Sequence, residues 1–401
     1  MTWTFHSAGS LLYGRGILAR LGDVTARLRA KRVFVVTDAV LKKAGLVDRV
    51  TGPLAAAGIT AEVFDGGQPE PALAVIRSAV NAAKAFHPDA VLGLGGGSNM
   101  DAAKLTALVL AHGGDATDYV GDCRVPGPVT PLVCVPTTAG TGSEVSAAAV
   151  FTDTDKKIKV SCLSPYLRPA AAVVDPSLTD FCPAKVTADS GIDALTHAVE
   201  AYTAVDQAEF LTRPPGGETV YQGKNPMADT MAEKAIRLVG KFLVRAVKDG
   251  SDREARDGMA LAATLGGLAF ANAGVALVHA MEYPVGGAVH VSHGAGNGLL
   301  LPHVMRFNLP ARVEAMAEIA QLLGYRDPHA TPHERAAEAI QVVEQMRHAI
   351  GIPTRLRDLG VTEAMLPAFA EKAFAIKRLM RVNPRMPRSA DEILTVYQAA
   401  F

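Results

Sequence analysis

The stretch AVLGLGGGSNMDAAKLTALVLAH, residues 90–112, decides the fold class of this chain. It begins as a short continuous apolar run, which is typical of a buried strand, and from residue 100 onward its apolar residues follow helical spacing. The glycines between these two parts let the backbone approach a phosphate, and the start of the following helix offers unpaired N–H groups and a positive dipole end. Ser98 stands where the usual dinucleotide motif has its third glycine. The stretch therefore predicts a strand–turn–helix unit that binds a nucleotide, with a plain tight turn as the alternative.

Short β-branched runs alternate with helical segments around this stretch, up to about residue 180. The runs that we expect to be strands are residues 31–39, 61–67, 90–98, 129–138 and 170–176. Strand, helix and strand in repetition predict a largely parallel sheet covered by helices. Beyond about residue 185 the apolar periodicity is helical. We therefore expect an α/β Rossmann-like domain over residues 1–184 and an all-α domain over residues 185–401.

The composition excludes several classes of partner. The 401 residues carry 40 Lys and Arg against 40 Asp and Glu, which gives no electrostatic reason to expect nucleic acid or an anionic membrane as partner. No apolar run is long enough to span a bilayer, and the N-terminal residues show no secretory signal. The four cysteines are scattered, as in reduced proteins. These features favour a cytoplasmic enzyme.

A second polar loop, PTTAGTGSEVS at residues 136–146, also follows an apolar strand. Its hydroxyl groups suit contacts with phosphate and nicotinamide, and they belong to Thr137, Thr138, Thr141 and Ser143. Ligands collect at the carboxyl edge of a parallel sheet, so this position favours a dinucleotide site over a surface turn.

Asp38 ends the strand expected at residues 31–39. A carboxylate there can accept a hydrogen bond from a ribose 2′-hydroxyl and would repel a 2′-phosphate, which favours NAD over NADP. The same side chain would equally serve as the N-cap of the helix that follows. Lys42 and Lys43 nearby leave the cofactor preference open.

Four residues of the C-terminal half form a candidate metal site. Asp193 and His197 lie four apart on a predicted helix, hence on one face. An ion pair on the surface is the alternative, but the neighbouring residues are apolar and a buried pair needs partners. His279 and His293 would complete a site of one carboxylate and three imidazoles, which suits Fe(II), Zn(II), Mn(II) or Ni(II).

Six segments together resemble the iron-containing (group III) alcohol dehydrogenase family over nearly the whole chain. They are GGGSNMDAAK, PTTAGTGSEVS, VVDPSLT, SGIDALTHAVEAY, HAMEYPVGG with HVSHG, and NPRMPRSADEI. The resemblance implies a fold like that of dehydroquinate synthase, with NAD(P) and a divalent metal between the two domains. The metal ligands that it implies are Asp193, His197, His279 and His293. The cofactor-binding residues that it implies are Asp38, Gly96, Gly97, Ser98, Asp101, Thr137, Thr138, Thr141 and Lys159.

Two features depart from the commonest family pattern. Many members have a second histidine four residues after the position of His279, where this chain has Tyr283. A phenol can still donate a hydrogen bond or relay a proton, although its pKa near 10 makes it titrate differently. Tyr283 and the insert at residues 213–229 resemble the hydroxyacid–oxoacid transhydrogenase branch. Tyr283 and His290 are therefore the candidate catalytic side chains, with His290 as a residue of the pocket wall.

The family resemblance implies reversible hydride transfer between a primary alcohol, or a hydroxy acid, and NAD, with Fe(II) or another divalent metal such as Zn(II) as Lewis acid. One alternative is a transhydrogenase that retains NAD and passes hydride from 4-hydroxybutyrate to 2-oxoglutarate. Another is a lyase of the dehydroquinate synthase kind, although the segments around the metal ligands lack the basic residues that a phosphate would need. The family also implies a small-molecule substrate and a homodimer or larger homo-oligomer.

Overall fold

A computed structural model of the chain describes residues 2–153 and 158–401. By its internal contacts the chain divides into two units. The α/β unit comprises His6–Phe181 with Glu218–Val220, and the helical unit comprises Cys182–Gly217 and Tyr221–Phe401 with the residues up to Phe5. The sequence placed the domain boundary between residues 184 and 185, and the structure divides the chain after Phe181.

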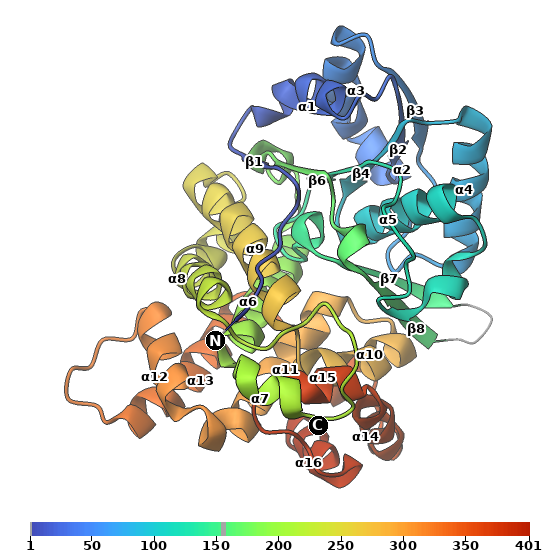
Figure 1. Cartoon of the computed structure of the whole chain (residues 1–401). Helices are drawn as coiled ribbons and strands as arrows, with labels where there is room; N and C mark the ends of the chain where they lie inside the picture. The colour runs from blue at the N-terminus through green and yellow to red at the C-terminus, as the bar shows by residue number, and fades with distance from the viewer. Residues whose placement is uncertain (1, 154–157) are drawn as a thin grey trace. The chain divides into compact units, whose positions relative to one another are not determined.

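A six-stranded parallel sheet forms the centre of the α/β unit (Figure 1). In spatial order the strands are β1 (Leu11–Tyr13), β9 (Ala171–Val174), β6 (Leu132–Pro136), β4 (Ala90–Gly95), β2 (Arg32–Val36) and β3 (Thr60–Phe64). The carboxyl ends of β4 and β6 lie side by side, because Gly95 is in register with Pro136. The two polar loops that the sequence singled out therefore emerge at one edge of the sheet.

Helices cover both faces of this sheet. Alternate residues of β2 point to opposite sides, so that Val35 packs with α1 (Leu21–Arg27) and α3 (Leu46–Ala56), and Phe34 packs with α4 (Leu73–Phe86) and α5 (Gly97–His112). Strands buried on both faces have apolar side chains throughout, as β4 does. The predicted fold class, a parallel α/β domain followed by a helical domain, is confirmed.

A second, three-stranded sheet was not expected from the sequence. It consists of β5 (Gly121–Asp122), β8 (Ile158–Leu163) and β7 (Ala148–Asp153), with β7 and β8 antiparallel. Residues of β7 alternate between buried and half-buried, which is the pattern of a strand with one covered face. The edge strand β1, only three residues long, was likewise not expected.

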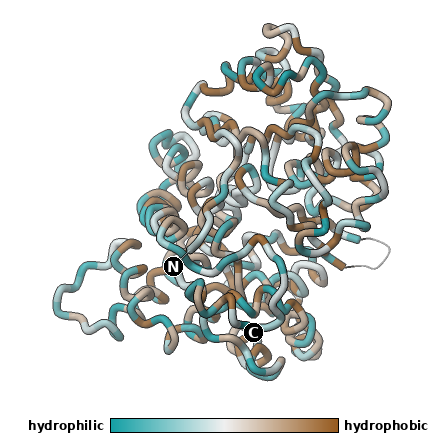
Figure 2. Tube along the Cα trace, viewed as in Figure 1, coloured by the Kyte–Doolittle hydropathy of each residue, from teal (hydrophilic) through white to brown (hydrophobic). Residues whose placement is uncertain are grey.

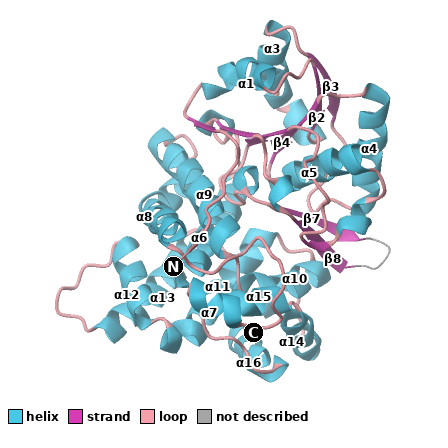
Figure 3. Ribbon diagram, in the orientation of Figure 1, coloured by secondary structure: helices cyan, strands magenta, loops and turns pink. Residues whose placement is uncertain are grey.

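Residues 182–217 and 221–401 contain helices and no strand (Figure 3). In chain order these helices are α6 (Ala184–Thr203), α7 (Gln207–Thr212), α8 (Pro226–Lys248), α9 (Arg253–Ala273), α10 (Leu277–Val289), α11 (His293–Asn308), α12 (Val313–Leu322), α13 (Pro332–Ala349), α14 (Leu366–Ala375), α15 (Lys377–Val382) and α16 (Ala390–Ala400). The loop between α12 and α13 is hydrophilic along most of its length (Figure 2), as expected of an exposed connection.

No single helix of the described chain is long and apolar enough to cross a membrane. The pair α9 and α10 meets the criteria of length and composition only when taken together, and the two are bent by 106°.

Glycines let α11 pack closely against α6. A Cβ atom at Gly294 would lie 2.0 Å from the backbone oxygen of Asp189, and one at Gly298 would lie 2.7 Å from the side chain of Ile192. Because Gly294 follows His293 directly, this close approach brings the start of α11 beside Asp193 on α6.

We predict that Gly294→Ala lowers the free energy of unfolding by about 1–3 kcal/mol, because the backbone must shift to admit the methyl group. Gly287→Ala is the matched control, since a Cβ atom there meets nothing within 4 Å. Replacing glycine by alanine inside a helix leaves the free energy of unfolding unchanged or raises it by up to about 1 kcal/mol. Urea unfolding of both variants measures the difference, and equal stability would contradict the packing described.

Candidate functional site

The helices α6, α10 and α11 present one carboxylate and two imidazoles to a common point. Asp193 is buried on α6, His279 is buried near the start of α10, and His293 is the half-buried first residue of α11. One oxygen of Asp193 and one nitrogen of each histidine all lie within 4.8 Å of one another. The structure therefore brings together three of the four residues expected to bind a metal.

Two buried glutamates fix the histidine rings. Glu200 Oε2 lies 2.6 Å from His279 Nδ1, and Glu282 Oε2 lies 2.5 Å from His293 Nδ1. A carboxylate is only an acceptor, so each Nδ1 carries the hydrogen and donates it. The lone pair of each ring is therefore on Nε2, the nitrogen that faces Asp193 and can bind a metal.

Glu200 also holds the start of α10. Its Oε2 accepts a hydrogen bond from the backbone N–H of Ala276 at 2.9 Å, and its Oε1 accepts from that of Val278 at 2.7 Å. A carboxylate is stabilised at a helix N-terminus by the unpaired N–H groups and the dipole. Glu200 thus positions both the helix and the imidazole of His279.

The side-chain nitrogen of Asn297 lies at the point where three hydrogen-bond acceptors converge. Its Nδ2 lies 2.8 Å from Asp193 Oδ1, 3.2 Å from His279 Nε2 and 3.1 Å from His293 Nε2. An amide nitrogen has two hydrogens and cannot donate to three acceptors at once. Three acceptors that converge on one point fit a cation, and a carboxylate with imidazoles is a donor set for Fe(II) or Zn(II). The residues present therefore fit the metal that the sequence predicts.

His197, the fourth expected ligand, lies beside this group. Its Nε2 is 3.9 Å from Asp193 Oδ1, and its ring stacks on those of His279 and Phe270, with centroids 4.9 and 4.3 Å away. Burial lowers the pKa of His197 to about 4, so the ring is neutral near pH 7, as a metal ligand must be.

Asp193 is ionised despite its burial. Burial by itself raises the pKa of this carboxyl, but the three neighbouring imidazoles and the hydrogen bond from Asn297 outweigh it and lower the pKa. The carboxylate oxygen that faces the three imidazoles is therefore anionic.

The two candidate catalytic side chains differ in their burial. The ring of Tyr283, half-buried on α10, has its centroid 6.0 Å from that of His293. His290 is exposed, and it forms the C-cap of α10 with a φ of 54°. Tyr283 is therefore the candidate whose ring lies beside that of a proposed metal ligand.

The glycine-rich loop follows β4 as expected. Gly96 is the N-cap of α5, and no side chain caps that helix, so its first N–H groups remain available for an anion. A Cβ atom at Gly97 would lie 2.9 Å from the side chain of Thr141 in the second loop. Glycine at this position therefore permits the two loops to pack together.

Two charged residues of α5, Lys104 and Asp101, form hydrogen bonds with the second polar loop. Lys104 is fully buried and donates to Ser143 Oγ at 2.8 Å and to Ala148 O at 2.7 Å. Burial lowers the pKa of Lys104, and Asp101 opposes this effect. The carboxylate of Asp101 accepts from Ser143 Oγ at 2.7 Å and from the backbone N–H of Val150 at 3.0 Å. Asp101, expected to bind the cofactor, thus anchors residues of the second loop and of β7.

The remaining cofactor candidates also contact other parts of the α/β unit. Asp38 is the N-cap of α2 (Ala39–Lys43), and its Oδ2 accepts from Asn99 Nδ2 at 2.7 Å. Ser98 Oγ accepts from the backbone N–H of Glu70 at 3.1 Å, and Lys159 pairs with the carboxylate of Glu70 at 2.6 Å. Thr137 is buried and its N–H donates to Gly95 O at 3.0 Å, whereas Thr138 is half-buried.

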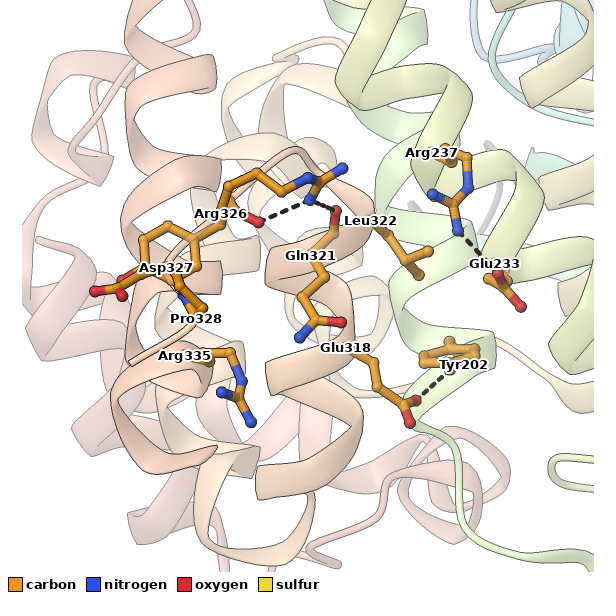
Figure 4. A pocket seen from close by; sticks show the side chains of 11 residues that line it. Tyr202, Glu233, Arg237, Glu318, Gln321, Leu322, Arg326, Asp327, Pro328 and Arg335 are labelled. Atoms are coloured by element: carbon orange, nitrogen blue, oxygen red, sulfur yellow. Dashed lines mark hydrogen bonds and ion pairs between the residues drawn. The ribbon is translucent and has the colours of Figure 1, made fainter. Parts of the chain in front are cut away.

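The helical unit also contains a polar cavity of about 550 Å³ (Figure 4). Its charged groups contact one another or the backbone. Tyr202 donates to Glu318, Arg237 pairs with Glu233 at 3.1 Å, and Arg326 donates to two backbone carbonyls. These groups do not form a convergent set of acceptors like that around Asp193.

The sequence reading did not identify Glu200, Glu282 or Asn297. Helical spacing was the available signal, because each lies three or four residues after an expected ligand: Glu200 after His197, Glu282 after His279, and Asn297 after His293. Such spacing places two side chains on one face of a helix.

Comparison with known proteins gives matches over the whole chain. Residues 8–176 match iron-containing alcohol dehydrogenase, and residues 219–401 match the C-terminal region of the Fe-containing alcohol dehydrogenase family. The chain is 38% identical over 391 residues to NAD-dependent methanol dehydrogenase of Bacillus methanolicus, which covers 98% of each protein. It is 39% identical over 392 residues to long-chain-alcohol dehydrogenase 1 of Geobacillus thermodenitrificans, with 97% of this chain and 94% of the relative covered. The crystal structure of a 1,3-propanediol oxidoreductase superposes with a TM-score of 0.93 at 36% identity over 100% of both chains.

We predict that His279→Ala lowers the affinity for Fe(II) or Zn(II) by more than about 100-fold, because loss of a ligand costs more than the 10–100-fold that loss of a ligand's hydrogen-bond partner costs. Metal content after loading and desalting measures this effect. His290→Ala is the control and should retain one metal per chain. Full metal content in His279→Ala would contradict the assignment.

Proposed function

The chain belongs to the iron-containing alcohol dehydrogenase family, and from this premise we propose that it transfers hydride reversibly between a small primary alcohol and NAD. It is a metal-dependent oxidoreductase that interconverts alcohols and aldehydes with a nicotinamide cofactor. The observation that carries the proposal is the convergence of Asp193, His279 and His293 within 4.8 Å.

The proposed ligands are these three residues and His197. When they hold Fe(II), or Zn(II) as the alternative, the metal supplies a Lewis acid for the alcohol oxygen. The chain's own contribution is to keep the ligands in place. Glu200 and Glu282 hold two imidazoles with Nε2 toward the site, and Asn297 holds the carboxylate of Asp193.

The proposed cofactor site uses the edge of the sheet where β2, β4 and β6 end. The first N–H groups of α5, at Gly97 and Ser98 beyond the N-cap Gly96, would bind the pyrophosphate. Asp38 would accept from the adenosine ribose, since its carboxylate lies at the end of β2. The proposed site is completed by Thr137, Thr138, Thr141 and Lys159. Asp101 belongs to it as the residue that anchors the second loop.

The substrate that we propose is an uncharged alcohol. Residues 190–200 and 278–298, which supply the metal ligands, contain no Lys or Arg. A hydroxy acid or a phosphate ester would need such a cation beside its anionic group. This absence argues against a lyase of the dehydroquinate synthase kind, and the relatives named as methanol and 1,3-propanediol dehydrogenases support a dehydrogenase over a transhydrogenase.

The transhydrogenase remains the second candidate, because Tyr283 and the insert at residues 213–229 resemble that branch. A homodimer or larger assembly and a cytoplasmic location stay predictions from the resemblance. Light scattering on the purified protein tests the assembly.

We expect the Fe(II)-loaded protein to form NADH from NAD with 1-propanol or 1,3-propanediol. Its kcat/KM for these alcohols should exceed that for 4-hydroxybutyrate by about tenfold or more, equivalent to about 1.4 kcal/mol for the unpaired carboxylate. Formation of 2-hydroxyglutarate from 4-hydroxybutyrate and 2-oxoglutarate, with no NAD added, would contradict this proposal and establish the alternative.

We further predict that Tyr283 relays the proton released from the alcohol. Tyr283→Phe should then lower kcat by about 100-fold and change the pH dependence of the rate, as loss of a general acid–base group does. His290→Ala tests the second candidate in the same assay, and its exposed ring predicts a smaller effect on kcat. A pH–rate profile of Tyr283→Phe identical to that of the wild type would exclude the phenol from proton transfer.

A further inference from the structure

Glu282 is a fully buried carboxylate that faces a metal ligand. It lies on α10, three residues after His279, and accepts a hydrogen bond from His293 Nδ1. Burial of an ionised carboxylate costs several kcal/mol unless it is paired and hydrogen-bonded. The chain keeps a carboxyl group at this position although an apolar side chain would pack there at less cost.

The packing around Glu282 leaves room for its side chain. A Cβ atom at Gly296 on α11 would lie 2.8 Å from Glu282 Cγ and 3.3 Å from its Oε1. A residue larger than glycine at 296 would displace the carboxylate from His293. The glycine therefore allows the glutamate of α10 to reach the histidine of α11.

His293 needs such a partner more than His279 does. The side chain of His293 is 33% exposed, whereas that of His279 is 3% exposed and is enclosed by its neighbours. A half-exposed imidazole has freedom to rotate and to exchange tautomers, and both motions weaken metal binding. His293 is also the first residue of α11, where the positive end of the helix dipole repels a cation.

We propose that Glu282 is a positioning residue for the metal centre: it fixes the ring and tautomer of His293 and adds a negative charge that raises the affinity for a divalent cation. This inference rests on the metal site of the proposed function. An imidazole that donates to a carboxylate is a stronger base at its other nitrogen, so Nε2 binds the metal more tightly. The carboxylate also offsets the helix dipole of α11.

The test compares metal affinity in Glu282→Gln, Glu282→Ala and the wild type. Zn(II) affinity is measured by competition with a chromophoric chelator at pH 7.5. We expect the dissociation constant to rise by about 10–100-fold in Glu282→Ala, the usual effect of removing a ligand's hydrogen-bond partner. The dissociation constant of Glu282→Gln should lie between those of the wild type and Glu282→Ala. The amide oxygen of glutamine still accepts a hydrogen bond from Nδ1 of His293 but carries no charge.

The visible spectrum of the Co(II)-substituted protein provides a second readout, since it reports ligand geometry. A shift of the bands in Glu282→Gln is expected. Glu318→Gln, which removes a carboxylate bound to Tyr202 in the same unit, is the control and should leave affinity and spectrum unchanged. Circular dichroism establishes that each variant is folded. If Glu282→Ala does not fold, Glu282→Gln carries the test alone, because glutamine has the shape of the native side chain.

The outcomes separate this inference from the function on which it rests. If the wild type binds no stoichiometric metal, the proposed function fails. If the wild type binds metal and Glu282→Gln has the same dissociation constant within twofold and the same Co(II) spectrum, the role of Glu282 is refuted and the proposed function stands.

Discussion

The burial of three carboxylates beside histidine rings is the constraint on which the helical unit depends. Asp193, Glu200 and Glu282 are all at most 4% exposed. Each would be costly in isolation, and hydrogen bonds from His279, His293 and Asn297 compensate part of that cost. A divalent cation between Asp193 and the imidazoles would offset part of the negative charge that these carboxylates carry when ionised.

The same constraint explains the packing of the helices around the site. The proposed ligands come from three helices, so α6, α10 and α11 must pack closely where Asp193, His279 and His293 converge. Gly294 and Gly298 permit this between α11 and α6, and Gly296 permits it between α11 and the side chain of Glu282. The alternate glycines at the start of α11 are thus explained by its neighbours, although glycine weakens a helix interior.

The sequence predicted those parts of the fold and site that local patterns determine. Strand β4, helix α5 and the glycines between them follow from one continuous motif, and the spacing of Asp193 and His197 follows from helical periodicity. The second sheet was missed because its strands β7 and β8 are half-covered and their pairing depends on contacts with other segments. Likewise, helical spacing alone did not distinguish Glu200 and Glu282 from surface residues, since their role depends on which helix each one faces. Asp38 illustrates a third limit, because its carboxylate caps α2 while the ribose contact stays a prediction.

The most direct test of the account is the anomalous diffraction of crystals of the Fe(II)-loaded protein, collected on both sides of the iron absorption edge. The account predicts one iron peak per chain among Asp193, His197, His279 and His293, with bonds of about 2.0–2.2 Å to a carboxylate oxygen and to imidazole nitrogens, as in other metal sites of this donor set. Glu200 and Glu282 should remain hydrogen-bonded to the far side of their histidines. An iron peak elsewhere in the chain, or full occupancy without His279 and His293 as ligands, would contradict it.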